Sequence, residues 1–450
     1  MSFSHADTIA PPPSLPPPQP EGRRAPLSGE AGQKPHSCRN WRKRANIAYS
    51  LPLRVSPRFS ASPRLIALLY LFTILASAQS PLVEQGFNHF YNLEYDPALA
   101  AFERAIAQNP NVPDYHNHVA QTLIFREMFR NGALESELVN GNNSFLRRPK
   151  LNPSPEVEKR ILDEIAKAMS LCDARLKTSP NDTAAMYALG IAYGLRSNYY
   201  WVVKKAWHDS LKDATAARKL HNRISALEPN NVDARLIQGL HDYIVGSLPW
   251  HWRTLGFLIG IHGDKERGIR TVQEVARNGR LNRQSAEVFL CALYRRENQP
   301  KQAIPLLKDL IRQYPRNFLL WLELAQMYSQ SGDGKSALDT LREVTRLKQS
   351  HAPGFDHLPW EKIYYQQGSV QFWYRDLDSS LDNLKKVVSH PDDVDLNTGA
   401  IAYLRMGQIY DMKSRRKEAL DEYRKCVAYA PQADAATEAR KYLSTPYRRQ

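Results

Sequence analysis

The sequence predicts an all-α fold, a solenoid of helical hairpins with inserts in its central third. A unit of 34 residues recurs along the chain, and its clearest copies begin at Gln79, Gln284, Phe318 and Ala400. Small residues and aromatic residues take the same positions in these copies, and prolines 110, 315 and 431 close three of them. A unit of this length, too small to bury its own apolar face, is typical of an array in which each hairpin packs against the next.

Each recurring position has a physical role. In the first copy, Gly86 and Ala98 let the two helices of the hairpin approach closely, and Phe102 fills the space between hairpins. Pro110 ends the second helix because proline lacks an amide donor and clashes with the preceding turn. The equivalent positions of the later copies are Leu290, Tyr294, Ala303, Trp321, Leu324, Ala325, Tyr328, Ala337, Gly368, Gly407, Tyr410, Ala419 and Tyr423.

This set of positions resembles the tetratricopeptide repeat family, most specifically over residues 284–431 and well over 79–110. The resemblance implies a right-handed superhelix with a concave groove lined by the first helix of each hairpin. It also implies that a protein or peptide partner binds in this groove. The groove positions fall on Arg295, Arg296, Gln326, Gln330, Tyr365, Phe372 and Gln408, which we expect to be exposed for partner binding.

The composition divides the chain into five parts. Residues 1–62 are rich in proline and arginine and are expected to be disordered, and a misplaced start codon would also explain them. The other expected parts are a signal peptide at 63–78, degenerate repeats with inserts at 79–282, a regular array at 283–433, and a capping helix with a tail at 434–450.

The signal peptide is predicted from Arg64, the apolar run 65–75 and the small residues 76–78. A run of 11 residues is well short of the ~20 that a membrane-spanning helix needs. We therefore expect cleavage after Ala78 and an exported protein in a bacterial periplasm. The alternative is an uncleaved segment that anchors the protein in the cell envelope.

A polar loop at residues 131–153 and two aromatic-rich inserts, at residues 196–210 and 246–258, interrupt the early and central repeats. The last is aromatic and contains Trp250, Trp252 and Phe257. These rings are expected to pack on the solenoid, and if exposed they would mark a contact with a partner or a membrane surface.

The sequence gives no support for catalysis, a cofactor or a metal. It contains no His-Glu-x-x-His, Cys-x-x-Cys or Gly-x-Ser-x-Gly motif. An enzyme remains a third alternative, with a site at the central inserts near His208, His251 and His262. The cysteines Cys172, Cys291 and Cys426 are expected to be buried thiols.

The charge distribution argues against nucleic acid as a partner. The formal net charge is +15, but residues 1–78 hold ten basic and three acidic side chains, so the rest carries 51 basic and 43 acidic groups. These alternate along the expected helices, whereas a nucleic-acid binder concentrates basic residues on one stripe. The sequence therefore predicts an exported, non-enzymatic scaffold for protein–protein interaction, with an oligomeric state that it does not indicate.

Overall fold

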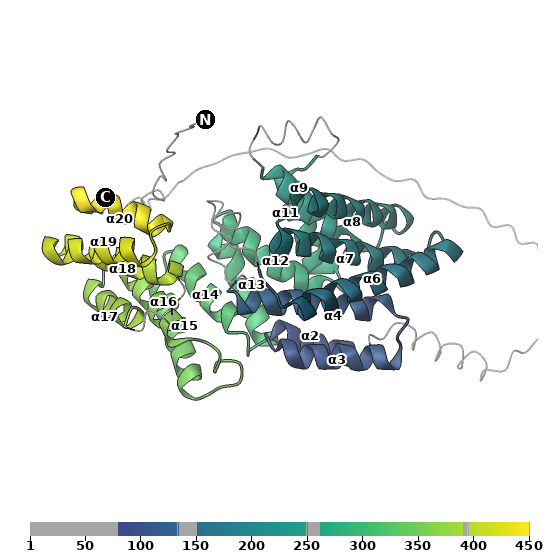
Figure 1. The fold of residues 1–450 in the computed structure, drawn as a ribbon, viewed down its shortest axis with the longest axis horizontal. Helices are drawn as coiled ribbons and strands as arrows, with labels where there is room; N and C mark the ends of the chain where they lie inside the picture. Colours follow the sequence, from purple (N-terminus) through teal and green to yellow (C-terminus); the bar gives the residue numbers. More distant parts are fainter. Residues whose placement is uncertain are drawn as a thin grey trace, which may run out of the picture. The chain divides into compact units, whose positions relative to one another are not determined.

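The computed structural model describes residues 80–132, 134, 151–248, 250, 262–389, 394 and 396–449, all within one compact unit that extends from Thr73 to Gln450. These residues form seventeen α-helices and no strand (Figure 1). The prediction of an all-α, tetratricopeptide-type solenoid is confirmed. The expected extension at 1–62 and the expected signal peptide at 63–78 lie outside the described residues.

The helices pair in chain order, each hairpin stacking on the next. The pairs are α2 (Pro81–Tyr91) with α3 (Tyr95–Gln108), α4 (Pro113–Arg130) with α6 (Pro155–Thr178), α7 (Thr183–Tyr199) with α8 (Trp207–Leu227), α9 (Arg235–Gly246) with α11 (Lys265–Asn278), α12 (Arg283–Arg296) with α13 (Pro300–Gln313), α14 (Phe318–Gln330) with α15 (Gly334–Gln349), α16 (Trp360–Trp373) with α17 (Leu377–Val387), and α18 (Leu396–Met412) with α19 (Arg416–Tyr429). The last helix, α20 (Asp434–Ser444), packs against α19.

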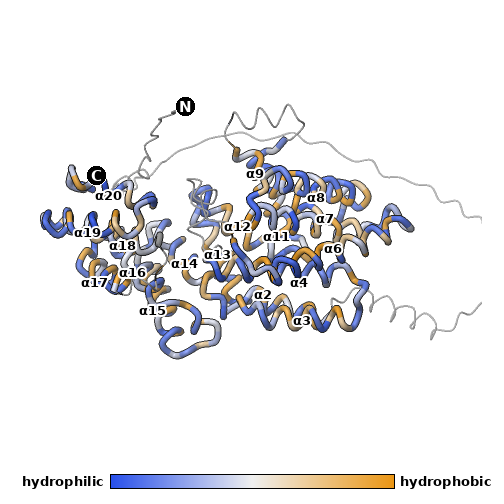
Figure 2. Tube along the Cα trace, viewed as in Figure 1, coloured by the Kyte–Doolittle hydropathy of each residue, from blue (hydrophilic) through white to orange (hydrophobic). Residues whose placement is uncertain are grey.

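The first helices of successive hairpins also touch one another, as α14 does with α16 and α16 with α18. We call the surface that they form the first-helix face. Apolar and polar residues alternate along the labelled helices (Figure 2), because each helix buries one side against its neighbours and exposes the other. This face is where the sequence predicts a groove.

The recurring small residues mark the closest helix contacts. A methyl group added to Gly86 would lie 2.4 Å from the ring of Phe102, and one added to Gly407 would lie 2.4 Å from the ring of Tyr423. Both rings are fully buried. Glycine is therefore required where these rings press on the backbone of the first helix. The alanines predicted at the other close position are also buried, namely Ala98, Ala303, Ala337 and Ala419.

Polar side chains cap the start of three helices in the regular array, α14, α15 and α17. The Asn317 side chain accepts hydrogen bonds from the backbone N–H groups of Leu319 and Leu320 at the start of α14. The Asp333 side chain accepts one from the Ser336 N–H at the start of α15. Such caps satisfy amides that have no partner inside the helix, and they fix where each helix begins.

The insert expected at residues 196–210 is mostly helical. The helix α7 runs on to Tyr199, a π-helix follows at Tyr200–Lys204, and α8 begins at Trp207. The longer helix is stabilised because Tyr199 is buried and its hydroxyl donates a 2.7 Å hydrogen bond to Glu158. Most of the polar loop expected at 131–153 and of the insert expected at 246–258 lies outside the described residues. These include only 131, 132, 134 and 151–153 of the loop and 246–248 and 250 of the insert.

The first hairpin packs against a part of the chain 194 to 222 residues away or slightly farther. The Glu94 carboxylate accepts hydrogen bonds of 2.6 Å and 3.0 Å from the Arg316 guanidinium, and the rings of Tyr91 and Tyr314 lie 4.9 Å apart. The Tyr91 hydroxyl also shares a 2.8 Å hydrogen bond with Ser285. We call these contacts the fold-back contact. They join α2 to the α12–α14 region directly.

Candidate functional site

Four of the seven residues predicted to line the groove are buried. The Arg295 side chain is fully buried and donates a 2.5 Å hydrogen bond to Glu323 on the next first helix. Gln408 is fully buried, and its amide donates to Glu438 at 3.1 Å. These side chains link one hairpin to the next, so the expectation that they are exposed is wrong.

The two aromatic residues predicted for the groove are core residues. Tyr365 is 9% exposed and Phe372 is fully buried, and both belong to the apolar cluster formed by α16 to α20. The positions that a repeat assigns to its groove lie beside the seam between hairpins. A large apolar side chain at such a position turns into that seam, because burial there removes apolar area from water.

The other three predicted groove residues reach the surface. Arg296 and Gln330 are exposed and Gln326 is half-buried. The Arg296 guanidinium lies over the ring of Tyr243, 5.6 Å from its centre. The structure therefore does not gather the seven residues into one binding surface, and partner binding by the exposed three stays a prediction.

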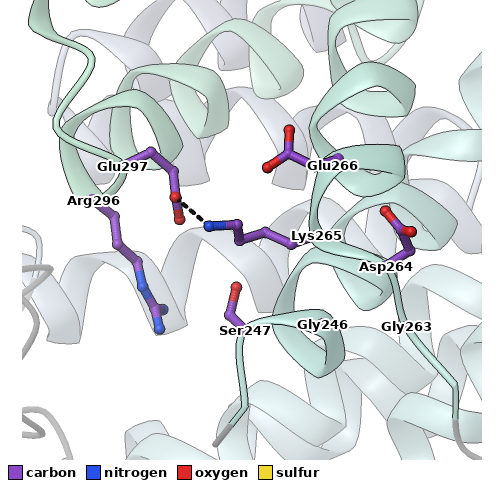
Figure 3. Close-up of a pocket in the computed structure, with 8 residues that line it drawn as sticks. All are labelled: Gly246, Ser247, Gly263, Asp264, Lys265, Glu266, Arg296 and Glu297. Atoms are coloured by element: carbon purple, nitrogen blue, oxygen red, sulfur yellow. Dashed lines mark hydrogen bonds and ion pairs between the residues drawn. The ribbon is translucent and has the colours of Figure 1, made fainter. Parts of the chain in front are cut away.

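A polar pocket lies where the end of α9 meets the start of α11 and the end of α12 (Figure 3). Its volume is about 510 Å³. It is lined by Gly246, Ser247, Gly263, Asp264, Lys265, Glu266, Arg296 and Glu297.

Internal hydrogen bonds already engage two of the charged groups of this pocket, Lys265 and Glu297. The Lys265 ammonium reaches across the pocket to Glu297 at 2.7 Å (Figure 3), and the Tyr243 hydroxyl donates to the same carboxylate at 2.9 Å. Burial opposes ionisation of Glu297, but these two donors hold the pKa of its carboxyl below the usual range. The carboxylate thus stays charged at neutral pH and joins α11 to α12, which is a structural role.

Of the three histidines considered for a catalytic site, the two that the structure describes both lie at the surface. His208 is almost fully exposed and His262 is also exposed, while His251 lies outside the described residues. Across the part of the chain that the structure describes, no group of three or more His, Cys, Asp or Glu side chains could hold a metal ion.

The three cysteines predicted to be buried thiols are buried and free. Burial raises the pKa of the Cys172 and Cys426 thiols to about 12 and raises that of Cys291 as well. Because the thiolate is the reactive form, these side chains are poor nucleophiles at neutral pH.

The sequence reasoning missed one surface cluster, at the C-terminal end of the array. The guanidinium groups of Arg405 and Arg449 both lie beside the Trp373 ring, 5.0 Å and 5.1 Å from its centre. A signal for it was present, since no acidic residue lies three or four positions from Arg405, whereas Arg424 has Asp421. An arginine without such a neighbour on its own helix is available for other contacts.

Of the aromatic residues Trp250, Trp252 and Phe257 in the second insert, only Trp250 is among the residues that the structure describes. Trp250 is 78% exposed, whereas Trp252 and Phe257 lie outside the described residues. Among the described helices, none has both the length and the apolar character to cross a membrane.

Two segments of the chain match known family models. Residues 294–354 and residues 400–432 match models described as tetratricopeptide repeat. The chain therefore contains tetratricopeptide repeats, and repeat proteins of this kind typically mediate protein–protein interaction as scaffolds. No curated protein matches the chain.

The chain is also similar to solved structures. The match to a chain of the APC/C hetero-tetramer Cut9–Hcn1 covers 84% of this chain and 59% of that chain. Its sequence identity is 15% and its TM-score is 0.44. The match to yeast Tom70 covers 81% of this chain and 94% of that chain, at 11% identity and a TM-score of 0.34. The match to the human IFIT1 dimer with m7Gppp-AAAA covers 83% of this chain and 89% of that chain, at 14% identity and a TM-score of 0.39.

Proposed function

We propose that this chain is an exported, non-enzymatic scaffold that binds a protein or peptide partner on its first-helix face. The observation that carries the proposal is the array itself, with two segments that match tetratricopeptide repeat models and first helices that present polar side chains at the surface. Arg296 and Gln330 are exposed there, and both lie near the ends of their helices. Extended or helical peptides are the usual partners of such surfaces.

Export is supported by the sequence alone. The apolar run 65–75 is preceded by Arg64 and followed by the small residues Ala76-Ser77-Ala78, which together have the three parts of a signal peptide. We place the mature protein in a bacterial periplasm, beginning at Gln79. Edman sequencing of the endogenous protein tests this directly, and a terminus upstream of residue 65 would contradict it.

Site-specific photo-crosslinking in native cells tests partner binding. A photoreactive amino acid replaces Gln330, exposed on α14, and in a matched control it replaces Arg312, exposed on α13, the second helix of the preceding hairpin. We expect a discrete crosslinked protein from position 330 that is absent from position 312. Identical products at both positions, or none at position 330, would contradict binding on the first-helix face.

A membrane-associated protein is the second candidate, favoured by exposed apolar side chains at the end of α9. Ile244, Leu248 and Trp250 are 58%, 40% and 78% exposed. Such a grouping is typical of a surface that meets a partner or a lipid interface. This candidate keeps residues 65–75 as an uncleaved anchor, and carbonate extraction of cell membranes separates it from the exported form, because the anchored protein is retained and the exported protein is released.

A further inference from the structure

The last hairpins carry a cluster of positive charge around one exposed aromatic side chain. The Arg405 guanidinium lies 5.0 Å from the centre of the Trp373 ring and 4.7 Å from that of Phe372. The Arg449 guanidinium lies 5.1 Å and 5.7 Å from the same two centres. Trp373 is 42% exposed, and Arg375 is exposed two residues after it. We call Arg375, Arg405, Arg449 and Trp373 the arginine cluster.

The three arginines lie close together without acidic partners. Arg405 and Arg449 contact the same indole ring, so their guanidinium groups are at most about 10 Å apart, which is the Debye length at ~0.1 M salt. Within the described residues none of the three forms an ion pair, and nearby Asp378 pairs with Lys413 instead. Burial, and then the charges of Arg375 and Arg405, lower the pKa of the Arg449 guanidinium. Tyr447 opposes part of this effect, but no carboxylate among the described residues pairs with the three arginines to offset their mutual repulsion.

The chain holds two of these guanidinium groups in place and leaves most of their donors unused. Arg449 donates to the carbonyl oxygens of Phe372 and Trp373, at 3.0 Å and 2.9 Å. Arg405 donates to the Gln408 side chain at 2.6 Å. A guanidinium has five N–H donors, so each group retains donors for an incoming acceptor. Pre-positioned arginines with spare donors are suited to bind carboxylates in a bidentate manner.

We propose that the arginine cluster is a docking site for an acidic peptide segment of a partner protein. This inference rests on the proposed scaffold function and assigns the chemistry of its partner. The carboxylates of the segment offset the repulsion among the three arginines and accept their unused donors. The site is formed by the end of α16 and the turn after it, by α18 and by the tail that follows α20, so the partner binds at the C-terminal end of the array.

The geometry favours a peptide over nucleic acid or lipid. Proteins that bind single-stranded nucleic acid stack bases on free aromatic faces, whereas here two guanidinium groups already lie against the Trp373 ring. A phosphate backbone or an anionic membrane is usually met by a longer stripe of basic residues than three arginines. A short acidic segment matches the size and the charge of the cluster.

Fluorescence anisotropy with the full chain tests the proposal. The probe is a fluorescein-labelled octa-glutamate peptide with an amidated C-terminus, compared with octa-glutamine. Arg405→Gln and Arg375→Gln each remove one charge from the cluster, and Arg424→Gln is the matched control, since Arg424 is an exposed arginine of α19 that pairs with Asp421 at 3.0 Å. We expect Kd to rise about tenfold for each cluster variant and less than twofold for the control.

Further measurements separate a lost site from a lost fold and from other ligands. Arg405→Lys keeps the charge and is expected to restore part of the affinity, and circular dichroism confirms that each variant keeps its helical content. Equal weakening by all three glutamine variants, or none, would overturn the proposal, because binding would then follow net charge alone. An octa-uridylate or a phosphatidylserine vesicle that binds more tightly through the same arginines would overturn it in favour of nucleic acid or lipid.

The crosslinking experiment shows which of the two proposals fails. If position 330 still captures its partner in the Arg405→Gln and Arg375→Gln variants, the scaffold function stands and the acidic-peptide inference is wrong. If both variants abolish that crosslink and also weaken octa-glutamate binding, the result supports both proposals, because the partner then depends on the arginine cluster.

Discussion

Replacing Arg316 with glutamine removes the main polar link of the fold-back contact. Arg316 donates two hydrogen bonds to Glu94, at 2.6 Å and 3.0 Å, and a third to the Asn88 side chain at 3.2 Å. Hydrogen bonds to a charged group contribute about 1.5–3 kcal/mol when buried. The Arg316 and Glu94 side chains are 30% and 25% exposed, so solvent screening reduces the free energy that these hydrogen bonds contribute. We therefore expect a loss of about 2 kcal/mol, which is a change of about 30-fold in the local opening equilibrium.

Hydrogen exchange read by mass spectrometry measures that opening. Peptides that cover residues 88–94 are expected to exchange about 30-fold faster in Arg316→Gln, whereas peptides from α18 and α19 are unchanged. Arg312→Gln is the control, because Arg312 is an exposed arginine on α13 with a partner only one turn away. Equal exchange at residues 88–94 in the two variants would refute the idea that the contact stabilises the first hairpin.

The same contact should weaken in acid. Burial opposes ionisation of Glu94, but the hydrogen bonds from Arg316 and His89 prevail and hold the pKa of its carboxyl below the usual value of 4.5. A carboxylate whose pKa is lowered by folding stabilises the folded state above its unfolded pKa and loses that contribution as the pH falls through the folded pKa. The difference in exchange rate at residues 88–94 between Arg316→Gln and wild type should therefore be largest at pH 7. It should become smaller below about pH 4.5.

Three more predictions test the interior. Gly407→Ala should lower the free energy of unfolding in urea by about 1–2 kcal/mol, because the clash with the buried Tyr423 ring outweighs alanine's better helix propensity. Glu164→Gln should destabilise the protein at pH 6 and have little effect near pH 9, because the Glu164 carboxylate raises the pKa of His116 and that contribution is lost as the pH rises through it. The Cys291 thiol should react with a disulfide reagent only after unfolding, since it is buried and its pKa is raised.

Each of these predictions can fail in a specific way. A Gly407→Ala protein as stable as the wild type would mean that the Tyr423 ring moves aside at no cost. A Glu164→Gln effect that does not change with pH would place the stabilisation in packing instead of the His116 pair. Rapid labelling of Cys291 in the native protein would show that α12 opens locally.

The repeat determines the contacts within a hairpin, and these could be read from the sequence. Gly407 and Tyr423 occupy fixed positions of one 34-residue unit, and their contact follows from the pairing of its two helices. The contact between Glu94 and Arg316 has no such origin, because it joins positions 222 residues apart. It depends on the angle between successive hairpins, and small differences in that angle add up along the array.

The prediction that the groove residues are exposed was wrong for four of them, for a related reason. A repeat position indicates the side of a helix but not what the next hairpin places against it. Arg295 lies at a groove position, yet Glu323 on the following first helix accepts its hydrogen bond and the pair is buried. Arg405, one turn before the buried Gln408, lies instead against Trp373 and remains half-buried at the surface. The sequence of one unit contains neither neighbour, so the burial of each arginine could not be derived from that unit.

The fold-back contact and the burial of the predicted groove residues together limit where a partner can bind. At the N-terminal end of the array, polar groups of the first helices are engaged with one another, as Tyr91 is with Ser285 and Tyr187 with Asn282. A partner that entered there would have to displace the fold-back contact, of which we expect the Arg316 link alone to contribute about 2 kcal/mol. No comparable displacement is needed at Arg375 and Arg405, because neither has an acidic partner among the described residues. The difference in free energy favours the C-terminal hairpins as the place of first contact, and a variant that opens the fold-back contact, such as Arg316→Gln, should leave octa-glutamate binding unchanged.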